Sequence, residues 1–182
     1  MCGPRPTVLI LASGLGTRYA ASGGQGSKLQ ATLLGKPVLQ HTLDTVRASG
    51  LPYHLESAAH PGMGDSIAAA VAATRDADGW LVLPGDLPLV QSSTLLAVAD
   101  LLALHAVVVP VFGGQRGHPV GFGAACREAL LGLSGANGAA VVVRAHGSHE
   151  VVLDDVGIVT DVDTVQDLER AAQLLTQRKA LS

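Results

Sequence analysis

The chain has 182 residues, of which 48% are hydrophobic and 15% charged, and its formal net charge is −3. This length predicts a single domain over residues 1–182, because one domain usually takes ~100–200 residues. The weakly acidic balance excludes non-specific nucleic-acid binding, which depends on clustered Lys and Arg. No apolar run reaches the ~20 residues that span a bilayer, and the N-terminal run is too short for a signal peptide. We therefore expect a cytoplasmic protein without a membrane partner.

Short apolar runs alternate along the chain with stretches of helical length. The predicted strands cover residues 7–11, roughly 53–57, 79–85, 106–111 and 149–155, and the predicted helices cover 37–49, 64–73, 93–104, 123–133 and 164–178. Continuous apolar runs are typical of parallel strands that are buried on both faces. The alternation predicts an α/β fold, in which ligands bind beyond the carboxyl ends of the strands.

A glycine-rich segment, residues 12–28, follows the first strand. Glycine lets a backbone approach a ligand closely, and successive N–H groups in such a loop can bind an anion. Arg18 and Lys28 add two positive charges, which suits a polyphosphate. The segment is not a P-loop, and Tyr19 stands where a dinucleotide fingerprint requires glycine. On composition alone, a flexible surface loop with two cations is an equal alternative.

Several motifs carry a resemblance to a known family. "LASGLGTR" followed by Lys28 resembles the LAAGxGxR…K signature of nucleotidyltransferases. "PGMGDSIAAAV", "LVLPGDLPLV", "RGHPVGFG", "LSGANGA" and "TDVDTVQDL" then follow in the order expected of molybdenum cofactor cytidylyltransferases and MobA-like relatives. The opening signature is widely shared, but the combination is more specific and covers nearly the whole chain. The resemblance implies a three-layer Rossmann-like nucleotidyltransferase fold with a mainly parallel central sheet.

The resemblance also implies a set of site residues and a Mg²⁺ cofactor. Catalytic roles fall on Arg18, Lys28 and Asp86, and metal binding on Asp86 and Asp163, with Asp161 nearby. The nucleotide-binding positions are Leu11, Ala12, Ser13, Gly14, Gly16, Arg18, Lys28, Ser66 and Gly85, and the acceptor-binding positions are Arg116, Gly117, His118 and Pro119. The chemistry agrees, since attack on an α-phosphate needs positioning and charge stabilisation, and magnesium prefers carboxylates together with phosphates.

Structural roles remain open for some of these residues. Asp86 could only begin a turn, and Asp163 could cap the last helix. His118 could be a turn residue with a satisfied side chain. Ser66 could cap a helix, or the helix N-terminus could address phosphate or ribose. If Asp86 and Asp163 do lie together, their charges should repel each other until a metal binds.

The sequence departs from the family pattern at two places. Between the helix at 37–49 and the "PGM" segment, residues 50–60 leave room for one strand but not for a crossover helix. One strand–helix unit is therefore expected to be missing near the base and ribose of the nucleotide. Ser13 is the second departure, because cytidylyl members typically have alanine there and guanylyl members glycine.

The function implied by the resemblance is transfer of CMP from CTP to the terminal phosphate of a molybdopterin-type acceptor, with release of pyrophosphate. A molybdenum hydroxylase would be the client that receives the product. Guanylyl transfer and transfer to another phosphorylated acceptor, such as a sugar or polyol, are alternatives within the same class. A non-catalytic chaperone that binds molybdenum cofactor is the alternative from another class, and the missing unit favours it.

Overall fold

The structure is a computed structural model that describes residues 5–14 and 16–180, so Cys2 lies outside it. The strands are β1 (Thr7–Leu11), β2 (Thr32–Leu33), β3 (Lys36–Pro37), β4 (Tyr53–Glu56), β5 (Gly79–Pro84), β6 (Val107–Phe112), β7 (Gln115–Arg116), β8 (Val120–Gly123) and β9 (His149–Val152). The helices are α1 (Thr17–Ala21), α2 (Val38–Ser49), α3 (Met63–Ala73), α4 (Ser92–Leu101), α5 (Arg127–Leu131), α6 (Ala140–His146) and α7 (Val165–Ala180), with 3-10 turns η1 (Lys28–Gln30), η2 (Ala124–Cys126) and η3 (Val156–Val159).

In the described part of the chain, seven strands form one mixed sheet in the order β4-β1-β5-β8-β6-β7, with β9 paired to β6. The pairs β4–β1, β1–β5 and β6–β9 are parallel, whereas β8 runs antiparallel between β5 and β6. The carboxyl ends of β1, β4, β5, β6 and β9 therefore meet at one edge. That edge is where ligands bind in sheets of this kind.

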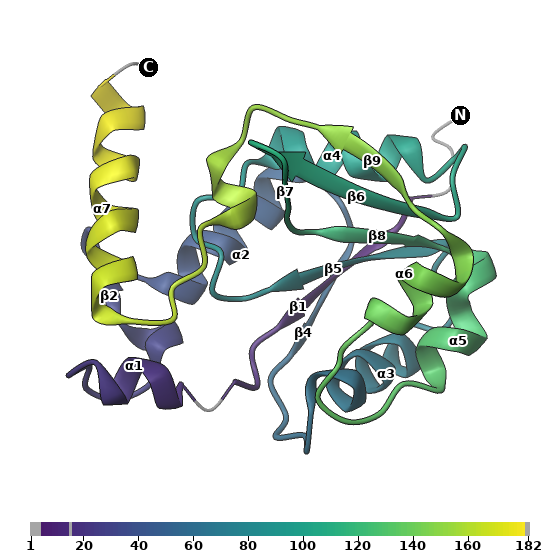
Figure 1. Cartoon of the computed structure of the whole chain (residues 1–182), viewed down its shortest axis with the longest axis horizontal. Coiled ribbons are helices and arrows are strands. Elements are labelled where there is room, and N and C mark those ends of the chain that lie inside the picture. Colours follow the sequence, from purple (N-terminus) through teal and green to yellow (C-terminus); the bar gives the residue numbers. More distant parts are fainter. Residues whose placement is uncertain (1–4, 15, 181–182) are drawn as a thin grey trace.

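Helices cover both faces of the sheet, which confirms the predicted three-layer architecture (Figure 1). Successive residues of a strand point to opposite faces. Val8 and Ile10 pack in the cluster that contains Leu43 of α2, whereas Leu9 packs in the cluster that contains Ile67 of α3. The strands are apolar at every position because both faces are covered. Helix α7 stands beside the sheet and packs against the segment around β2.

The predicted helix at 123–133 is wrong in its first part. Residues 120–123 form β8, residues 124–126 form η2, and the α-helix begins only at Arg127. The sequence of β8, VGFG, contains two glycines and carries a weak strand signal, because glycine has little strand propensity. Pairing with β5 on one side and β6 on the other makes this segment a strand.

The expected loss of a strand–helix unit agrees with the topology. Strand β4 follows α2 directly, pairs with β1 in parallel, and is the edge strand on that side of the sheet. Residues 57–62 then lead to α3 without a helix between them. The edge of the site near β4 is therefore built by a short connection.

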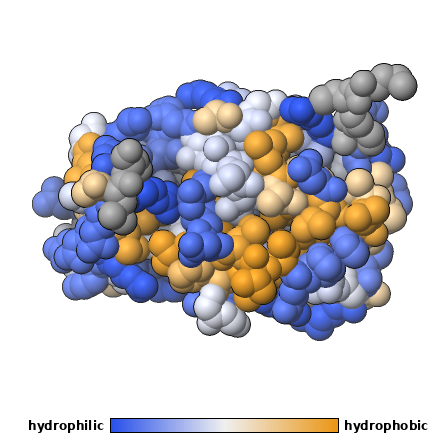
Figure 2. All heavy atoms as spheres, turned by 90° about the horizontal axis from the view of Figure 1, so that it is seen from above, coloured by the Kyte–Doolittle hydropathy of each residue, from blue (hydrophilic) through white to orange (hydrophobic). Residues whose placement is uncertain are grey.

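The outer surface of the molecule carries both hydrophobic and hydrophilic residues. Seen from the β9 side, hydrophobic residues form a band across the middle of the molecule, with hydrophilic residues around it (Figure 2). Val152 of β9 is exposed, and Cys126 is a buried free thiol.

No helix within residues 5–14 and 16–180 is both long and apolar enough to cross a bilayer.

Candidate functional site

Asp86 lies directly after β5, and glycine at position 85 fixes its place. The Gly85 N–H donates to the Leu11 carbonyl at 2.8 Å, and the Thr42 hydroxyl donates to the Gly85 carbonyl at 3.0 Å. A Cβ at Gly85 would come within 2.9 Å of the Leu39 side chain and 3.1 Å of the Leu11 carbonyl. A larger residue would crowd the Leu11 carbonyl and the Leu39 side chain. Gly85 therefore positions Asp86 from behind the site.

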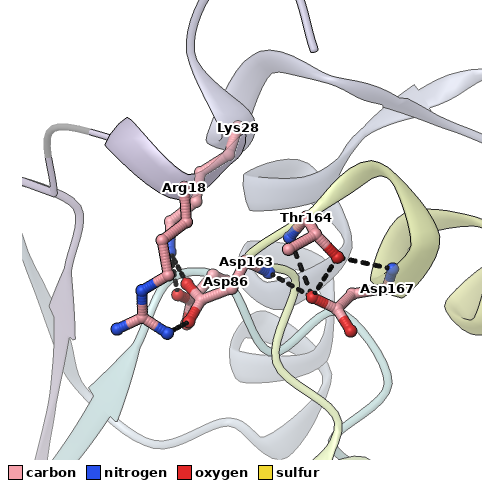
Figure 3. Close-up of polar contacts among 6 residues, drawn as sticks. All are labelled: Arg18, Lys28, Asp86, Asp163, Thr164 and Asp167. Carbon is pink, nitrogen blue, oxygen red and sulfur yellow. Dashed lines mark hydrogen bonds and ion pairs between the residues drawn. The ribbon is translucent and has the colours of Figure 1, made fainter. Parts of the chain in front are cut away.

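Four charged side chains from distant parts of the chain meet at this edge (Figure 3). The Lys28 ammonium donates to Asp86 Oδ2 and to Asp163 Oδ1, with both distances 2.6 Å. Arg18 Nη1 donates to Asp163 Oδ2, also at 2.6 Å. The Lys28 and Asp86 side chains are 12% and 15% exposed, whereas Arg18 is 78% exposed. The structure thus brings together the predicted catalytic and metal-binding residues in one cluster.

The segment before α7 carries Asp163 to this cluster. Val162 N–H donates to the Asp86 carbonyl at 3.0 Å, which ties this segment to the end of β5. Thr164 and Asp167 form the capping box predicted from the sequence: Asp167 N–H donates to Thr164 Oγ1 at 3.1 Å, and Thr164 N–H donates to Asp167 Oδ2 at 2.8 Å. Since these residues cap the helix, the Asp163 carboxylate is left to face Lys28.

The cluster shifts the pKa values of Lys28 and Asp163 in opposite directions, and both shifts favour the charged form of the group. Burial alone would lower the pKa of Lys28, but the charges and hydrogen bonds of Asp86 and Asp163 outweigh burial and raise it. Burial alone would raise the pKa of Asp163, but Lys28 and Arg18 outweigh burial and lower it. The repulsion expected between the two carboxylates is therefore offset by Lys28, which corrects the expectation from sequence.

The carboxylate oxygens of Asp86 and Asp163 are suitable ligands for a magnesium ion that also binds a phosphate. One oxygen of each carboxylate converges on the Lys28 ammonium, and the buried Asp86 Oδ1 has no hydrogen-bond partner. Magnesium commonly uses one or two carboxylates and takes its other ligands from phosphates and water. Among the described residues, no three His, Cys, Asp or Glu side chains form a metal-binding group. Asp86 and Asp163 would be the protein ligands, and phosphate oxygens or water would supply the others.

A cleft of about 300 Å³ opens between the loop after β1 and the start of α3, and we call it the β1–α3 cleft. Its lining consists of Leu11, Ser13, Gly14, Lys28, Leu29, His60, Pro61, Gly62, Met63, Ser66, Pro84 and Asp86. Inside it, the Ser13 and Ser66 hydroxyls lie 2.8 Å apart and join the loop to α3. Ala12 and Gly16, which were predicted to bind nucleotide, are not part of this lining. Gly16 adopts φ +62° just before α1, which is why the loop needs glycine there.

A second cleft of about 460 Å³ continues past Asp86, and we call it the bridging cleft. It is lined by Arg18, Lys28, Met63, Pro84, Asp86, Leu87, Gln115, Arg116, Gly117, His118, Ile158, Val159, Asp161 and Asp163. Burial, together with the charges of Asp163, Asp86 and Asp167, raises the pKa of Asp161. This cleft joins the charged cluster to the segment predicted to bind the acceptor.

Beyond that segment lies a third cavity of about 450 Å³, which we call the apolar hollow. Its lining consists of Met63, Ile67, Val82, Val109, Arg116, Gly117, His118, Val120, Phe122, Asn137, Gly138, Ala139, Ala140, Val143 and Arg144. Most of these side chains are apolar, and Arg116 and Arg144 are the charged ones. The hollow lies between the sheet, α3 and α6. Helix α6, like α1, was not predicted from the sequence.

The predicted acceptor segment separates the bridging cleft from the apolar hollow. Arg116 pairs with Glu150 of β9 at 2.6 Å, and His118 N–H donates to the Ile158 carbonyl at 3.0 Å. Burial lowers the pKa of His118, and the Asp86 charge opposes this only in part. Arg116, Gly117 and His118 line both cavities, whereas Pro119 is buried and lines neither.

Sequence reasoning missed residues on the α3 side of the site. Met63 lines all three cavities, and His60 lines the β1–α3 cleft. Met63 is the last residue of the "PGM" motif and His60 directly precedes it, but the motif was recognised only as a family signature. Their position directly before a predicted helix, at the site edge of the sheet, was the available signal.

The family model for the MobA-like NTP transferase domain matches residues 45–151. That match covers more than half of the chain. The chain belongs to this family. Its enzyme class is nucleotidyltransferase, as the sequence predicted. The segment before residue 45, which supplies Arg18 and Lys28, lies outside the match but completes the same site.

Comparison with individual proteins agrees with the family. The bifunctional protein GlmU of Desulfitobacterium hafniense is 27% identical over 146 residues, which cover 69% of this chain and 32% of that protein. The chain thus spans about a third of the length of that curated relative.

Among solved structures, Rv0371c from Mycobacterium tuberculosis superposes with a TM-score of 0.80 at 23% identity, covering 93% of this chain and 98% of that one. The same protein is also known in complex with manganese. Molybdopterin-guanine dinucleotide biosynthesis protein A from Archaeoglobus fulgidus superposes with a TM-score of 0.68 at 15% identity, covering 94% of this chain and 99% of that one. At these identities the likeness shows the shared fold.

Proposed function

We propose that this nucleotidyltransferase uses magnesium to transfer CMP from CTP to the terminal phosphate of a molybdopterin-type acceptor, with release of pyrophosphate. The observation that carries the proposal is the position of the Lys28–Asp86–Asp163 cluster. It lies where the β1–α3 cleft and the bridging cleft meet, and the bridging cleft leads on to the apolar hollow. A nucleotide and an acceptor can therefore approach Asp86 from two sides.

Lys28 and Arg18 are suited to bind the triphosphate. Both now donate to carboxylate oxygens, and phosphate oxygens accept the same kind of hydrogen bond. When the triphosphate enters, the two cations can exchange a carboxylate partner for a phosphate partner. That exchange would leave Asp86 and Asp163 as ligands for magnesium, which supplies positive charge to the triphosphate when bound.

The proposed reaction is a direct displacement at phosphorus. An oxygen of the acceptor phosphate forms a bond to the α-phosphorus of CTP, the bond to the β-phosphate oxygen breaks, and its electron pair leaves with pyrophosphate. The acceptor phosphate is largely ionised at pH 7, so no protein base is required to activate it. Lys28 and Arg18 contribute by positioning the chain of phosphates and by neutralising the leaving pyrophosphate.

The apolar hollow favours an acceptor with a flat heterocyclic body. Ile67, Val82, Val109 and Phe122 offer few partners for the hydroxyls of a sugar or polyol, and burying unpaired hydroxyls is costly. A pterin can place its ring faces against these side chains and its polar edge toward Asn137, Arg116 or Arg144 of the lining, while its phosphate points toward His118 and the charged cluster. The fold shared with a molybdopterin-guanine dinucleotide biosynthesis protein supports the same acceptor class.

The choice of CTP rests on Ser13. Its side chain lines the β1–α3 cleft and is joined to Ser66, so it takes space at a close approach of the backbone. A one-ring base fits beside it more easily than a two-ring base. We expect Ser13→Gly to admit GTP and to narrow the preference for CTP, and competition kinetics with the two nucleotides would measure the change. An unchanged CTP/GTP ratio would remove Ser13 as the selector.

The reaction is tested by pyrophosphate release. Purified protein with magnesium and molybdopterin is supplied with CTP, GTP, ATP or UTP, and a sugar phosphate replaces molybdopterin in a parallel series. We expect the fastest release with CTP and molybdopterin. Preference for GTP would overturn the base assignment, and preference for the sugar phosphate would overturn the acceptor. Molybdopterin binding without any pyrophosphate release would favour the non-catalytic chaperone.

A further inference from the structure

An imidazole held by a buried carboxylate forms part of the wall of the β1–α3 cleft. His60 lines this cleft together with Ser13 and Ser66, and none of these three lines the bridging cleft. Lys28 and Asp86, by contrast, line both. His60 therefore belongs to the part of the cleft that lies away from the charged cluster.

Glu56 determines how His60 is held. This residue ends β4, is 8% exposed, and its backbone carbonyl accepts a hydrogen bond from Ala12 N–H at 2.8 Å. Its Oε1 accepts from Ala58 N–H at 3.1 Å and lies 3.2 Å from His60 Nε2, while Oε2 lies 3.3 Å from His54 Nε2. One buried carboxylate thus fixes two imidazoles and the short connection after β4.

The hydrogen bonding fixes which nitrogen of His60 carries the proton. Burial alone would raise the pKa of Glu56, but the hydrogen bonds from His60, Ala58 and His54 outweigh burial and lower it. An ionised carboxylate only accepts hydrogen bonds, so His60 Nε2 must donate. A neutral imidazole that donates through Nε2 keeps Nδ1 as an acceptor. Because His60 lines the β1–α3 cleft, Nδ1 of its neutral form is the acceptor that it can offer to a ligand there.

We propose that His60, positioned by Glu56, contacts the nucleoside of the bound nucleotide and contributes to nucleotide selection. The inference rests on the proposed function, because that function places the triphosphate at Lys28. With the phosphates there, the nucleoside extends along the cleft past Ser13 and Ser66 to His60. The donors that a nucleoside offers to Nδ1 are an exocyclic amine of the base and a hydroxyl of the ribose.

The chain contains a matched control for this role. His54 contacts the same carboxylate as His60, but it is not part of the cleft lining. If the two imidazoles served only to hold the connection after β4, their removal would have similar consequences. A role in nucleotide binding would show only for His60.

The test is calorimetric titration of wild type, His60→Ala and His54→Ala with CTP, GTP, UTP, 2′-deoxy-CTP and inorganic tripolyphosphate. We expect His60→Ala to raise the Kd of the preferred nucleotide about three- to ten-fold, as for loss of one hydrogen bond. Tripolyphosphate has no nucleoside, so its Kd should stay within twofold. His54→Ala should leave every Kd within twofold.

The nucleotide analogues identify the donor. If the base amine is the donor, His60→Ala reduces the preference for CTP over UTP. If a ribose hydroxyl is the donor, wild type binds 2′-deoxy-CTP more weakly than CTP, and His60→Ala abolishes that difference. Either result supports the proposal.

Glu56 is tested as a positioning residue by a double-mutant cycle. Glu56→Gln should weaken nucleotide binding in the wild-type background but not in the His60→Ala background, because the effect acts through His60. His60→Gln, which retains an acceptor, should recover part of the affinity. Thermal melting of each variant establishes that it is folded before titration.

Two results would overturn the proposal. One is that His60→Ala and His60→Gln leave the Kd of all nucleotides unchanged, and the other is that they weaken tripolyphosphate as much as CTP. These results are distinct from failure of the proposed reaction. A wild-type protein that binds CTP but releases no pyrophosphate would overturn the reaction and leave the His60 assignment standing.

Discussion

The β1–α3 cleft and the apolar hollow lie on two sides of the same helix end but have different chemistry. Ser66 and Ile67 are consecutive residues of α3, yet Ser66 lines the cleft and Ile67 lines the hollow. Met63, in the first turn of α3, borders both. Neighbouring residues of a helix point about 100° apart, so one helix can form a polar wall on one side and an apolar wall on the other.

In the proposed function, this difference corresponds to the ligand that each cavity would hold. A polyphosphate is bound by charge and by exposed backbone N–H groups, and the cleft offers Lys28 and the glycine-rich loop for this purpose. A heterocyclic body is bound by excluding water, and the hollow offers Phe122 and Val109. The charged cluster at Asp86 belongs to the cleft side and the junction. A substitution in one cavity should therefore weaken binding of one ligand only. Substitutions in the Lys28–Asp86–Asp163 cluster, where the clefts meet, are the exception.

Asp86→Asn should have the largest effect, because Asp86 lies at the junction. Loss of a charge that holds magnesium should lower the rate of pyrophosphate release about 10²- to 10³-fold, as for loss of a key electrostatic group. Asp100→Asn, at an exposed position on α4, is the matched control and should retain full activity. Near-normal activity of the Asp86 variant at low magnesium would contradict the metal role.

Lys28→Ala should mainly impair triphosphate binding, although Lys28 borders the bridging cleft as well as the β1–α3 cleft. Loss of its charge-assisted hydrogen bonds should raise the Kd of CTP about 10- to 100-fold and that of CMP much less. The variant should also melt at a lower temperature, since Asp86 and Asp163 would face each other without their shared cation. Lys36→Ala removes the same charge from an exposed pair and should change neither quantity. Equal loss of CTP and CMP affinity in a titration would argue against phosphate binding.

Ala140→Phe should impair the hollow side alone. Ala140 lines the apolar hollow, and a phenyl ring there would fill space that the acceptor needs. We expect the KM for molybdopterin to rise about 5- to 50-fold while the Kd of CTP stays constant, because one steric contact is worth about 1–3 kcal/mol. Ala145→Phe, at an exposed position on the same helix outside the hollow, is the control. If both variants behave alike, the hollow does not hold the acceptor.

Glu56→Gln should have the smallest effect, and this effect should depend on pH. The folded-state pKa of Glu56 lies below its ordinary value, so its charge stabilises the fold above that value and loses this contribution as pH falls through the folded-state pKa. At pH 7 the variant should melt a few degrees below wild type. The gap should close as the pH falls below about 4.5, the ordinary pKa of glutamate. Melting curves at several pH values measure this difference in melting temperature. A difference that stays constant with pH would show that the Glu56 charge is not responsible.

Local patterns in the sequence predicted the parts of the fold that depend on short-range physics. The continuous apolar runs at β1 and β5 identified buried strands, because both faces of these strands had to be covered. Thr164 and Asp167 identified the start of α7, because a capping box involves residues only three positions apart. The glycine-rich loop and the residues after β5 were placed at the ligand-binding edge by the rule for parallel strands.

Other features depended on contacts between distant segments, which a single sequence does not reveal. The two glycines of β8 favour no regular structure, and pairing with β5 and β6 made this segment a strand. The apolar hollow exists only because α6 packs over the sheet beside α3.

The same limit applies inside the site. From sequence, Lys28 was a ligand for phosphate and Asp86 and Asp163 were ligands for metal, each assigned separately. Their mutual pairing joins residues 58 and 135 positions apart. His60 and Glu56 were not recognised as site residues, because the role of a histidine depends on which carboxylate and which cavity lie beside it. Residue types and local spacing thus determined the strands, caps and charged groups of this protein, while the three-dimensional packing of distant segments alone decided which side chains share a cleft.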